Sequence, residues 1–330
     1  LGSLIAGFFG KIIGKSNTHR VTIGLMVVAF LSALWVLEKT TGVHVIKLYT
    51  WAVSGWPQAH GFHFDIALRS DRLTNIMMVV VTFVSLLVHI YTVGYMREDQ
   101  GYQRFFSYVS LFTVMMLLLV LSNNFMQLFL GWEGVGLVSY LLIGFWFTKN
   151  SAARGGLKAF IVNRIGDVGL LLAIAAIIDH AHSLNYQDVF ASWHSIALQK
   201  IQIFSGVDWH LDTVICILLF IGAMGKSAQV PLHVWLPASM EGPTPISALI
   251  HAATMVTAGV FMVARLWPLF NPCVPALSVI LIIGSTGALF LGLLAFVEFD
   301  IKRVIAYSTM SQLGYMMAAN GAQVYSLGIF

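Results

Sequence analysis

The sequence predicts an all-α polytopic membrane protein, and two observations carry that prediction: its composition and its long apolar stretches. Of the 330 residues, 58% are hydrophobic and 10% are charged, whereas about 25% are charged in an ordinary soluble domain. The mean hydropathy is +0.84. Because a soluble fold of this size needs a charged surface, this composition excludes a cytosolic enzyme and a disordered chain. The net charge of +4 is small and scattered, which excludes nucleic acid as a partner.

The apolar stretches give the expected spans. A helix needs about 20 apolar residues to cross a hydrocarbon core about 30 Å thick. We expect about ten transmembrane helices, of which the nearly complete ones are Val21–Leu37, Leu73–Val93, Phe105–Leu121, Phe125–Phe147, Phe160–Ile178, Ile246–Leu266, Val274–Val297 and Val304–Ala319. Leu1–Ile13 is expected to be the tail of another span and Val324–Phe330 the start of one. We therefore expect the chain to be a piece of a longer protein.

One shorter apolar run has a different ending. Thr213–Met224 leads into Gly225 and Lys226 and then into Pro231. We interpret it as a discontinuous helix with a buried lysine at the break. Non-helical backbone at membrane depth is tolerated only where it is packed in protein or lines a cavity, and broken helices mark ion sites in transporters. The alternative interpretation is a proline kink without a site.

The placement of Lys and Arg predicts the orientation. One set of alternating loops carries ten of these residues and the other set carries six, so the first set is expected on the cytoplasmic side. The ten are Lys11, Lys15, Arg20, Arg97, Arg104, Lys149, Arg154, Lys158, Lys302 and Arg303. The outer segments Thr40–Arg72 and Asp179–Asp212 hold tryptophans that suit a membrane–water interface, namely Trp51, Trp56, Trp193 and Trp209. The second segment is expected to contain an interfacial helix or a hairpin.

Four ionisable residues lie inside expected spans: Glu133, Asp167, Lys226 and His251. Each costs about 2.5–3.5 kcal/mol or more at the bilayer centre, so such residues are functional hypotheses by default. The alternative is that each one belongs to a packing ion pair or reaches an interface. Arg164 and Asp167 are three residues apart, share a helix face and are expected to pair.

The sequence shows no site for a redox cofactor. Cys216 and Cys273 are far apart and cannot supply a four-cysteine iron–sulfur cluster. Gly225-Lys226-Ser227 is not the end of a P-loop, because that motif needs a glycine where Phe220 stands. A haem-binding cytochrome, with span histidines such as His89 and His251 as ligands, is another class of function. Since no two span histidines share a helix at a suitable spacing, hydrogen-bonded core histidines are the simpler interpretation.

Four long motifs, in this order, carry a family resemblance. They are FSYVSLFTVMMLLLVLSNNFMQLFLGWEGVGLVSYLLIG (Phe106–Gly144), KAFIVNRIGDVG (Lys158–Gly169), GKSAQVPLHVWLPASMEGPTPISALIHAATMVTAG (Gly225–Gly259) and DIKRVIAYSTMSQLGY (Asp300–Tyr315). The chain resembles the subunit L family of the proton-pumping NADH:quinone oxidoreductase, respiratory complex I. That family includes mitochondrial NADH dehydrogenase subunit 5 and the large subunits of Mrp-type antiporters. The resemblance covers nearly the whole chain.

The resemblance implies an antiporter-like fold with two inverted five-helix repeats and a discontinuous helix near Lys226. Residues 1–104 would form N-terminal transmembrane helices and an outer loop, residues 105–266 the first repeat, and residues 267–330 the truncated start of the second. One departure is Ala238, where the family often has Asp, which argues against a charged role for that loop.

The resemblance also implies roles for the buried residues. Lys226 would carry the proton, Glu133 would modulate that lysine through a separable ion pair, and His251 would act as a relay. Asp167 and Lys302 would be supporting charges. The hydroxyl groups that would hold water between these groups are those of Ser227, Ser247, Thr254 and Thr257.

The implied function is proton translocation in the inner cell membrane. This chain would bind no cofactor, since NADH, FMN, iron–sulfur clusters and quinone are expected in partner subunits. Its partners would be the lipid bilayer and other membrane subunits of complex I, especially a neighbour that resembles subunit M. Two alternatives stay open: an Mrp-type Na⁺/H⁺ antiporter subunit, and a structural helix-bundle anchor without transport.

Overall fold

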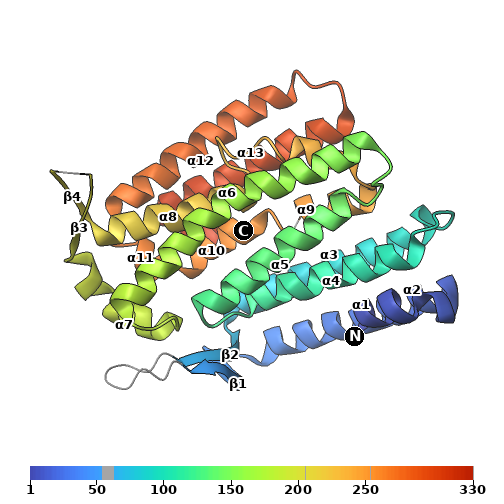
Figure 1. Cartoon of the computed structure of the whole chain (residues 1–330), viewed down its shortest axis with the longest axis horizontal. Coiled ribbons are helices and arrows are strands. Elements are labelled where there is room, and N and C mark those ends of the chain that lie inside the picture. The colour runs from blue at the N-terminus through green and yellow to red at the C-terminus, as the bar shows by residue number, and fades with distance from the viewer. Residues whose placement is uncertain (54–62, 205, 253, 330) are drawn as a thin grey trace.

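The computed structural model describes residues 1–53, 63–204, 206–252 and 254–329 and shows long helices side by side in a bundle (Figure 1). The long helices are α2 (Gly10–Lys39), α3 (Arg72–Tyr95), α4 (Tyr102–Val120), α5 (Phe125–Ile143), α6 (Asn150–Ala181), α8 (Leu211–Lys226), α12 (Val274–Ala295) and α13 (Ile301–Gly321). The short ones are α1 (Gly2–Leu4), the π-helical η1 (Ile5–Phe9), α7 (Tyr186–Ala197), the 3₁₀-helical η2 (Pro237–Glu241), α9 (Thr244–Ala252), α10 (Thr257–Arg265), α11 (Trp267–Phe270) and α14 (Tyr325–Ile329).

Six helical segments among the described residues are long and apolar enough to cross a membrane: Gly2–Lys39, α3, α4, α5, α6 and α12. The expected number of about ten is therefore not matched by count. Helix α8 has only 16 residues, α9 and α10 are interrupted, and α13 is rich in polar residues. Each of the nearly complete expected spans except Ile246–Leu266 lies on one helix, and α2 and α6 begin well before the expected spans.

The first residues form a helical hairpin with α2. The chain reverses at Gly14, whose φ of 78° is readily adopted only by glycine. Gly2 consequently lies beside Thr22 and Leu25. The expected separation of Leu1–Ile13 from the span Val21–Leu37 is confirmed.

The expected all-α fold is confirmed for the bundle, and the outer connections add short strands to it. They contain two antiparallel hairpins, β1 (His44–Val53) with β2 (His63–Ser70), and β3 (Lys200–Phe204) with β4 (Val207–His210). The second connection also contains α7, which buries one face through Tyr186, Val189, Trp193 and Ile196. Trp56 lies outside the described residues. Both hairpins and α7 lie at one end of the bundle, and the α3–α4, α5–α6 and α12–α13 connections lie at the other (Figure 1).

The expected single span Ile246–Leu266 is broken between Ala252 and Thr257. Threonine hydroxyls in this stretch bond to backbone carbonyls: Thr254 donates to Leu249 O, and Thr257 donates to Thr254 O at 3.0 Å. Such local bonds compete with the helical ladder. The hydroxyl of Ser227, at the end of α8, donates to Val256 O at 2.7 Å. The carbonyl of Val256, which lies in the break, thus receives a hydrogen bond from the end of α8.

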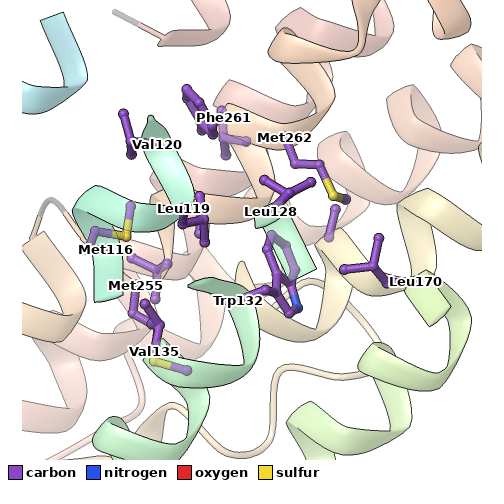
Figure 2. Close-up of a cluster of buried hydrophobic side chains, with 14 of the residues drawn as sticks. Met116, Leu119, Val120, Leu128, Trp132, Val135, Leu170, Met255, Phe261 and Met262 are labelled. Atoms are coloured by element: carbon purple, nitrogen blue, oxygen red, sulfur yellow. The ribbon is translucent and has the colours of Figure 1, made fainter. Parts of the chain in front are cut away.

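The core lies where α4, α5, α6 and α10 meet. Figure 2 shows Trp132 of α5 among Leu119, Leu170, Phe261 and Met262, and all five side chains are fully buried. Packing from all sides leaves the indole of Trp132 no other orientation, so its N–H group has a fixed direction.

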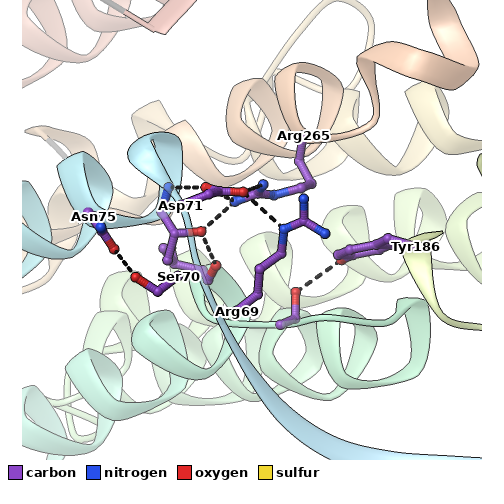
Figure 3. A network of polar contacts seen from close by, with 9 residues as sticks. Arg69, Ser70, Asp71, Asn75, Tyr186 and Arg265 are labelled. Carbon is purple, nitrogen blue, oxygen red and sulfur yellow. Dashed lines mark hydrogen bonds and ion pairs between the residues drawn. The ribbon is translucent and has the colours of Figure 1, made fainter. Parts of the chain in front are cut away.

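A buried ion network closes the hairpin end of the bundle (Figure 3). Asp71 caps α3 by accepting from Thr74 N at 2.9 Å, and Arg265 at the end of α10 binds its carboxylate with two guanidinium nitrogens. Arg69 Nε lies 2.9 Å from the same carboxylate. Burial raises the pKa of Asp71, but Arg265, the Thr74 N–H and Arg69 together hold that pKa well below its usual value. The network ties the start of α3 to the second half of the broken helix.

This network predicts that Asp71→Asn destabilises the full-length protein by about 3–5 kcal/mol, because the buried charge of Arg265 loses its partner. Asn caps helices about as well as Asp, so the change isolates the charge. The measurement is the free energy of unfolding or the apparent Tm in detergent. Because the pKa of Asp71 is lowered, its stabilisation is present at neutral pH and is lost only in strong acid.

The matched control is Lys47→Gln, which removes an ion pair to Asp65 whose lysine side chain is 56% exposed. That pair is expected to contribute at most about 1 kcal/mol. Equal losses in the two variants would show that the Asp71 network has no special importance for stability.

Candidate functional site

The end of α8 places a lysine in the interior of the bundle. Lys226 is the last residue of α8 and is fully buried. Beyond it Ala228 adopts a left-handed conformation with φ 47°, and Pro231 lacks a backbone N–H. The freed carbonyls find other donors, since Trp235 Nε1 donates to Gly225 O at 2.9 Å and Gln229 N donates to Met224 O at 3.0 Å. The predicted discontinuous helix is confirmed, and the negative end of its dipole favours the ammonium group.

Asp167 is the carboxylate that faces Lys226. Its Oδ2 lies 3.6 Å from Lys226 Nζ, and its Oδ1 accepts from Trp132 Nε1 at 2.7 Å. Both Lys226 Nζ and Asp167 Oδ2 lack a hydrogen-bond partner among the described residues. The ammonium also lies 5.8 Å from the centre of the Trp132 ring, a favourable cation–π distance. The indole therefore orients the carboxylate and covers the cation.

Two further charges extend this pair. Arg164 Nη1 lies 3.8 Å from Asp167 Oδ2, which confirms the expected pairing one helical turn apart. The same guanidinium forms an ion pair with Glu133 of α5. Four charges of alternating sign thus form one row, which we call the charge row: Glu133, Arg164, Asp167 and Lys226.

The expected direct ion pair between Glu133 and Lys226 is wrong. Within the described part of the chain, Glu133 pairs with Arg164, and the carboxylate that contacts Lys226 is Asp167. Asp167, expected as a supporting charge, is the immediate partner of the lysine. The reason is that α6 lies next to α8 and carries both Arg164 and Asp167 on the facing side, so Arg164 stands between the two expected partners.

The charge row runs from the outside of the chain to its core. The exposed fraction of the side chain falls from 37% for Arg164 and 20% for Glu133 to 4% for Asp167 and 0% for Lys226. Electrostatic interactions become stronger as solvent is excluded. A change at Glu133 and Arg164 therefore acts on a lysine that water does not screen.

Glycines make room for this arrangement. A Cβ at Gly166 would lie 3.0 Å from Gly225 Cα, so only small residues let α6 and α8 approach this closely. A Cβ at Gly136 of α5 would lie 2.6 Å from Lys226 Nζ. The lysine amine therefore occupies the space that a side chain at Gly136 would fill.

His251 and Lys302 are brought together elsewhere. Both line a cavity of about 230 Å³ with Ser247 and Thr309. His251 also lines a cavity of about 450 Å³ with Thr257, Ser308 and Gln312. Its Nε2 lies 3.1 Å from Ser239 Oγ, while Nδ1 lacks a hydrogen-bond partner among the described residues. Cavities of this size with several polar groups can hold water.

Lys226 does not line either of these two cavities. The residue after Lys226, Ser227, donates through Oγ to Val256 O, and the residue after Val256, Thr257, lines the larger cavity with His251. Of the expected water-binding hydroxyls, Ser247 and Thr257 line the cavities, and those of Ser227 and Thr254 bond to backbone carbonyls.

The sequence interpretation missed Trp132 and Ser239. The indole of Trp132 binds Asp167, and the hydroxyl of Ser239 binds His251. For Trp132 one signal was available, since a tryptophan next to Glu133 in the middle of a span needs a partner for its N–H. No comparable signal marks Ser239.

Comparison with known proteins agrees with this geometry. The family described as NADH:quinone oxidoreductase/Mrp antiporter, TM, matches residues 122–329, and the family described as NADH-ubiquinone oxidoreductase (complex I), chain 5 N-terminus, matches residues 56–106. NADH-quinone oxidoreductase subunit L of Neisseria meningitidis (serogroup A, strain Z2491) is 58% identical over 100% of this chain and 49% of its own length. NADH-ubiquinone oxidoreductase chain 5 of Marchantia polymorpha is 48% identical over 100% of this chain and 49% of its own length.

Among solved structures, the Mrp complex from Dietzia sp. DQ12-45-1b superposes with a TM-score of 0.81 at 24% identity and covers 99% of this chain and 34% of that one. This likeness confirms the antiporter-like fold. The chain spans about half the length of the curated relatives it matches. Since the family match covers more than half of its residues, the chain belongs to the NADH:quinone oxidoreductase/Mrp antiporter family of transmembrane proteins.

Proposed function

We propose that this chain is part of a proton-translocating membrane subunit of an NADH:quinone oxidoreductase. The observation that carries the proposal is the charge row, which ends on a fully buried lysine at a broken helix. The names of the relatives, subunit L and chain 5, support the same conclusion. NADH, FMN, iron–sulfur clusters and quinone would be bound by partner subunits, and the neighbours would be other membrane subunits, including one that resembles subunit M.

In the proposed mechanism Asp167 is shared between two cations. Its Oδ2 lies 3.6 Å from Lys226 Nζ and 3.8 Å from Arg164 Nη1, so the carboxylate interacts with both cations at once. When Glu133 holds Arg164, Asp167 is available to stabilise the ammonium of Lys226. When Glu133 is neutralised or moves away, Arg164 forms its ion pair mainly with Asp167 instead. The buried ammonium then loses part of its counter-charge and becomes more costly in the low-dielectric interior.

A lysine in that condition gives up its proton. Lys is suited to this because its protonation responds to its surroundings, whereas Arg stays charged in proteins. The proton would move past the Ser227–Val256 contact to water in the cavities beside His251. Lys302 lines one of these cavities and would bias the electrostatic potential there.

The proposed division of the chain has three parts: N-terminal helices in residues 1–104, the first repeat in residues 105–266 and the start of the second repeat in residues 267–330. The proposed location is the inner cell membrane.

A second candidate is a subunit of an Mrp-type Na⁺/H⁺ antiporter, because the matched family spans both classes and the Mrp fold superposes over nearly the whole chain. The two candidates are distinguished by purifying the full-length protein with its partners. NADH-driven proton pumping that needs no Na⁺ supports the first candidate. Na⁺/H⁺ exchange without NADH oxidation supports the second.

The geometry predicts that Asp167→Asn impairs proton pumping more than Glu133→Gln does. Asp167→Asn leaves the ammonium of Lys226 unpaired, at a cost of about 3–5 kcal/mol, which weakens proton binding at Lys226 by a factor of about 10² or more. Glu133→Gln lets Arg164 compete for Asp167 but leaves that carboxylate in place, so Lys226 keeps part of its counter-charge. The measurement is the proton-to-electron ratio of the assembled complex in proteoliposomes, with assembly checked on a native gel.

Asp179→Asn is the matched control, since Asp179 lies near the end of the same helix and its side chain is 81% exposed. It is expected to pump at the unmodified ratio. Greater loss in Glu133→Gln than in Asp167→Asn would mean that Glu133, and not Asp167, controls the lysine.

A further inference from the structure

A groove at the end of the bundle opposite the hairpins lies between η1, the start of α2, and α4. One part of this groove is a cavity of about 540 Å³, whose polar lining includes Lys11, Gln103, Arg104 and Ser107. A second cavity of about 180 Å³ adjoins it and is lined mainly by aromatic and aliphatic groups, among them Tyr140, Leu141 and Phe145. The two cavities share Arg104, Tyr108 and Phe147 and therefore lie side by side. We call the two cavities together the basic groove.

The two cations of the basic groove, Lys11 and Arg104, form no ion pair among the described residues. Within the described residues, no carboxylate lies within 4 Å of Lys11 or Arg104. The oxygens of the nearby Asp99 carboxylate accept from Gly101 N at 2.6 Å and from Trp146 Nε1 at 3.0 Å. Lys11 and Arg104 are therefore not held in ion pairs and remain available to an anion at the mouth of the groove.

Arg104 is held in place, and in the part of the chain that the structure describes only one nitrogen of its guanidinium donates a hydrogen bond. Its guanidinium lies 4.6 Å from the ring centre of Phe145 and 5.3 Å from that of Phe147. One nitrogen, Nη2, donates to Phe145 O at 3.4 Å. A guanidinium fork fixed on aromatic faces is well suited to bind two oxygens of a phosphate group.

The polarity of the groove changes along its length. Tyr108 lies four residues after Arg104 on α4, which places it about 6 Å further toward the middle of the bundle. The smaller cavity, which Arg104 and Tyr108 also line, is otherwise bounded mainly by aromatic and aliphatic groups, and Phe147 at the rim has 64% of its surface exposed. A basic head region above an apolar slot is complementary to an anionic amphiphile. Basic pockets between transmembrane helices bind anionic lipid headgroups by the same chemistry.

We propose that the basic groove binds an anionic phospholipid, with its phosphate on Lys11 and Arg104 and one acyl chain along Tyr108 and Leu141. This site is separate from the charge row and does not depend on the proposed function. It would hold the helical hairpin of residues 1–39 against α4 at the membrane surface.

The test uses the full-length protein in its native membrane complex, reconstituted with phosphatidylglycerol that carries a photoreactive diazirine in one acyl chain. Phosphatidylcholine with the same chain is the comparison lipid. The anionic lipid is expected to label the segment 140–147 at least about fivefold more strongly than the zwitterionic lipid at equal mole fraction. Lys11→Gln and Arg104→Gln should each reduce this labelling about fivefold. Arg104→Lys should retain only part of it, because an ammonium group keeps the charge but loses the planar fork and its stacking on the two rings.

Arg97→Gln is the control, since it removes the same charge at the same end of the bundle from a residue that lines neither cavity. It should leave labelling unchanged. Equal labelling by the two lipids in the unmodified complex would overturn the proposal without any variant. So would a loss in Arg97→Gln as large as in Arg104→Gln, which would indicate a general surface potential. Competition by inorganic phosphate would overturn it too and would indicate a site for free phosphate.

Discussion

A fully buried ammonium group is the constraint on which the centre of this structure depends. Lys226 has no exposed surface, and a charge in such a place costs several kcal/mol unless a counter-charge is fixed beside it. Asp167 supplies that charge, but only because α6 and α8 approach through Gly166 and Gly225. Trp132 in turn fixes the carboxylate through its indole N–H. The glycines, the tryptophan and the end of α8 at Lys226 together place one carboxylate beside this lysine.

The two broken helices satisfy each other's backbone. Inside a membrane every freed carbonyl needs a donor from the protein or from trapped water. The hydroxyl of Ser227 at the end of α8 donates to the carbonyl of Val256 in the break between α9 and α10, and the indole N–H of Trp235 donates to the carbonyl of Gly225. The far end of α10 is held by the ion pair of Arg265 with Asp71. A movement of α10 is therefore restrained at one end by a buried ion network and coupled at the other end to the lysine.

Hydropathy alone predicted most of the helices, because a span of about 20 apolar residues has few other uses. The break before Pro231 and the pairing of Arg164 with Asp167 were also predictable, because both depend on residues that are close together in the sequence. The partner of Lys226 was not, because Glu133 and Asp167 both lie inside spans and only the packing of α6 against α8 selects between them. The break after Ala252 contains no proline, so no helix-breaking residue marked it in the sequence. The β1 strand is exposed on both faces, so it has no alternating apolar pattern that would have predicted a strand. The roles assigned to His251 and Lys302 remain predictions.

The central claim is that Lys226 works by losing and regaining a proton, and not only by being a cation. The most direct measurement is the proton-to-electron ratio of the assembled complex carrying Lys226→Arg, which keeps the positive charge beside Asp167 but stays protonated. The account predicts that transfer through this subunit is almost abolished, as in Lys226→Ala, while an exposed control such as Lys47→Arg pumps normally. A Lys226→Arg complex that assembles and pumps at the unmodified ratio would contradict the account and leave Lys226 as a structural cation.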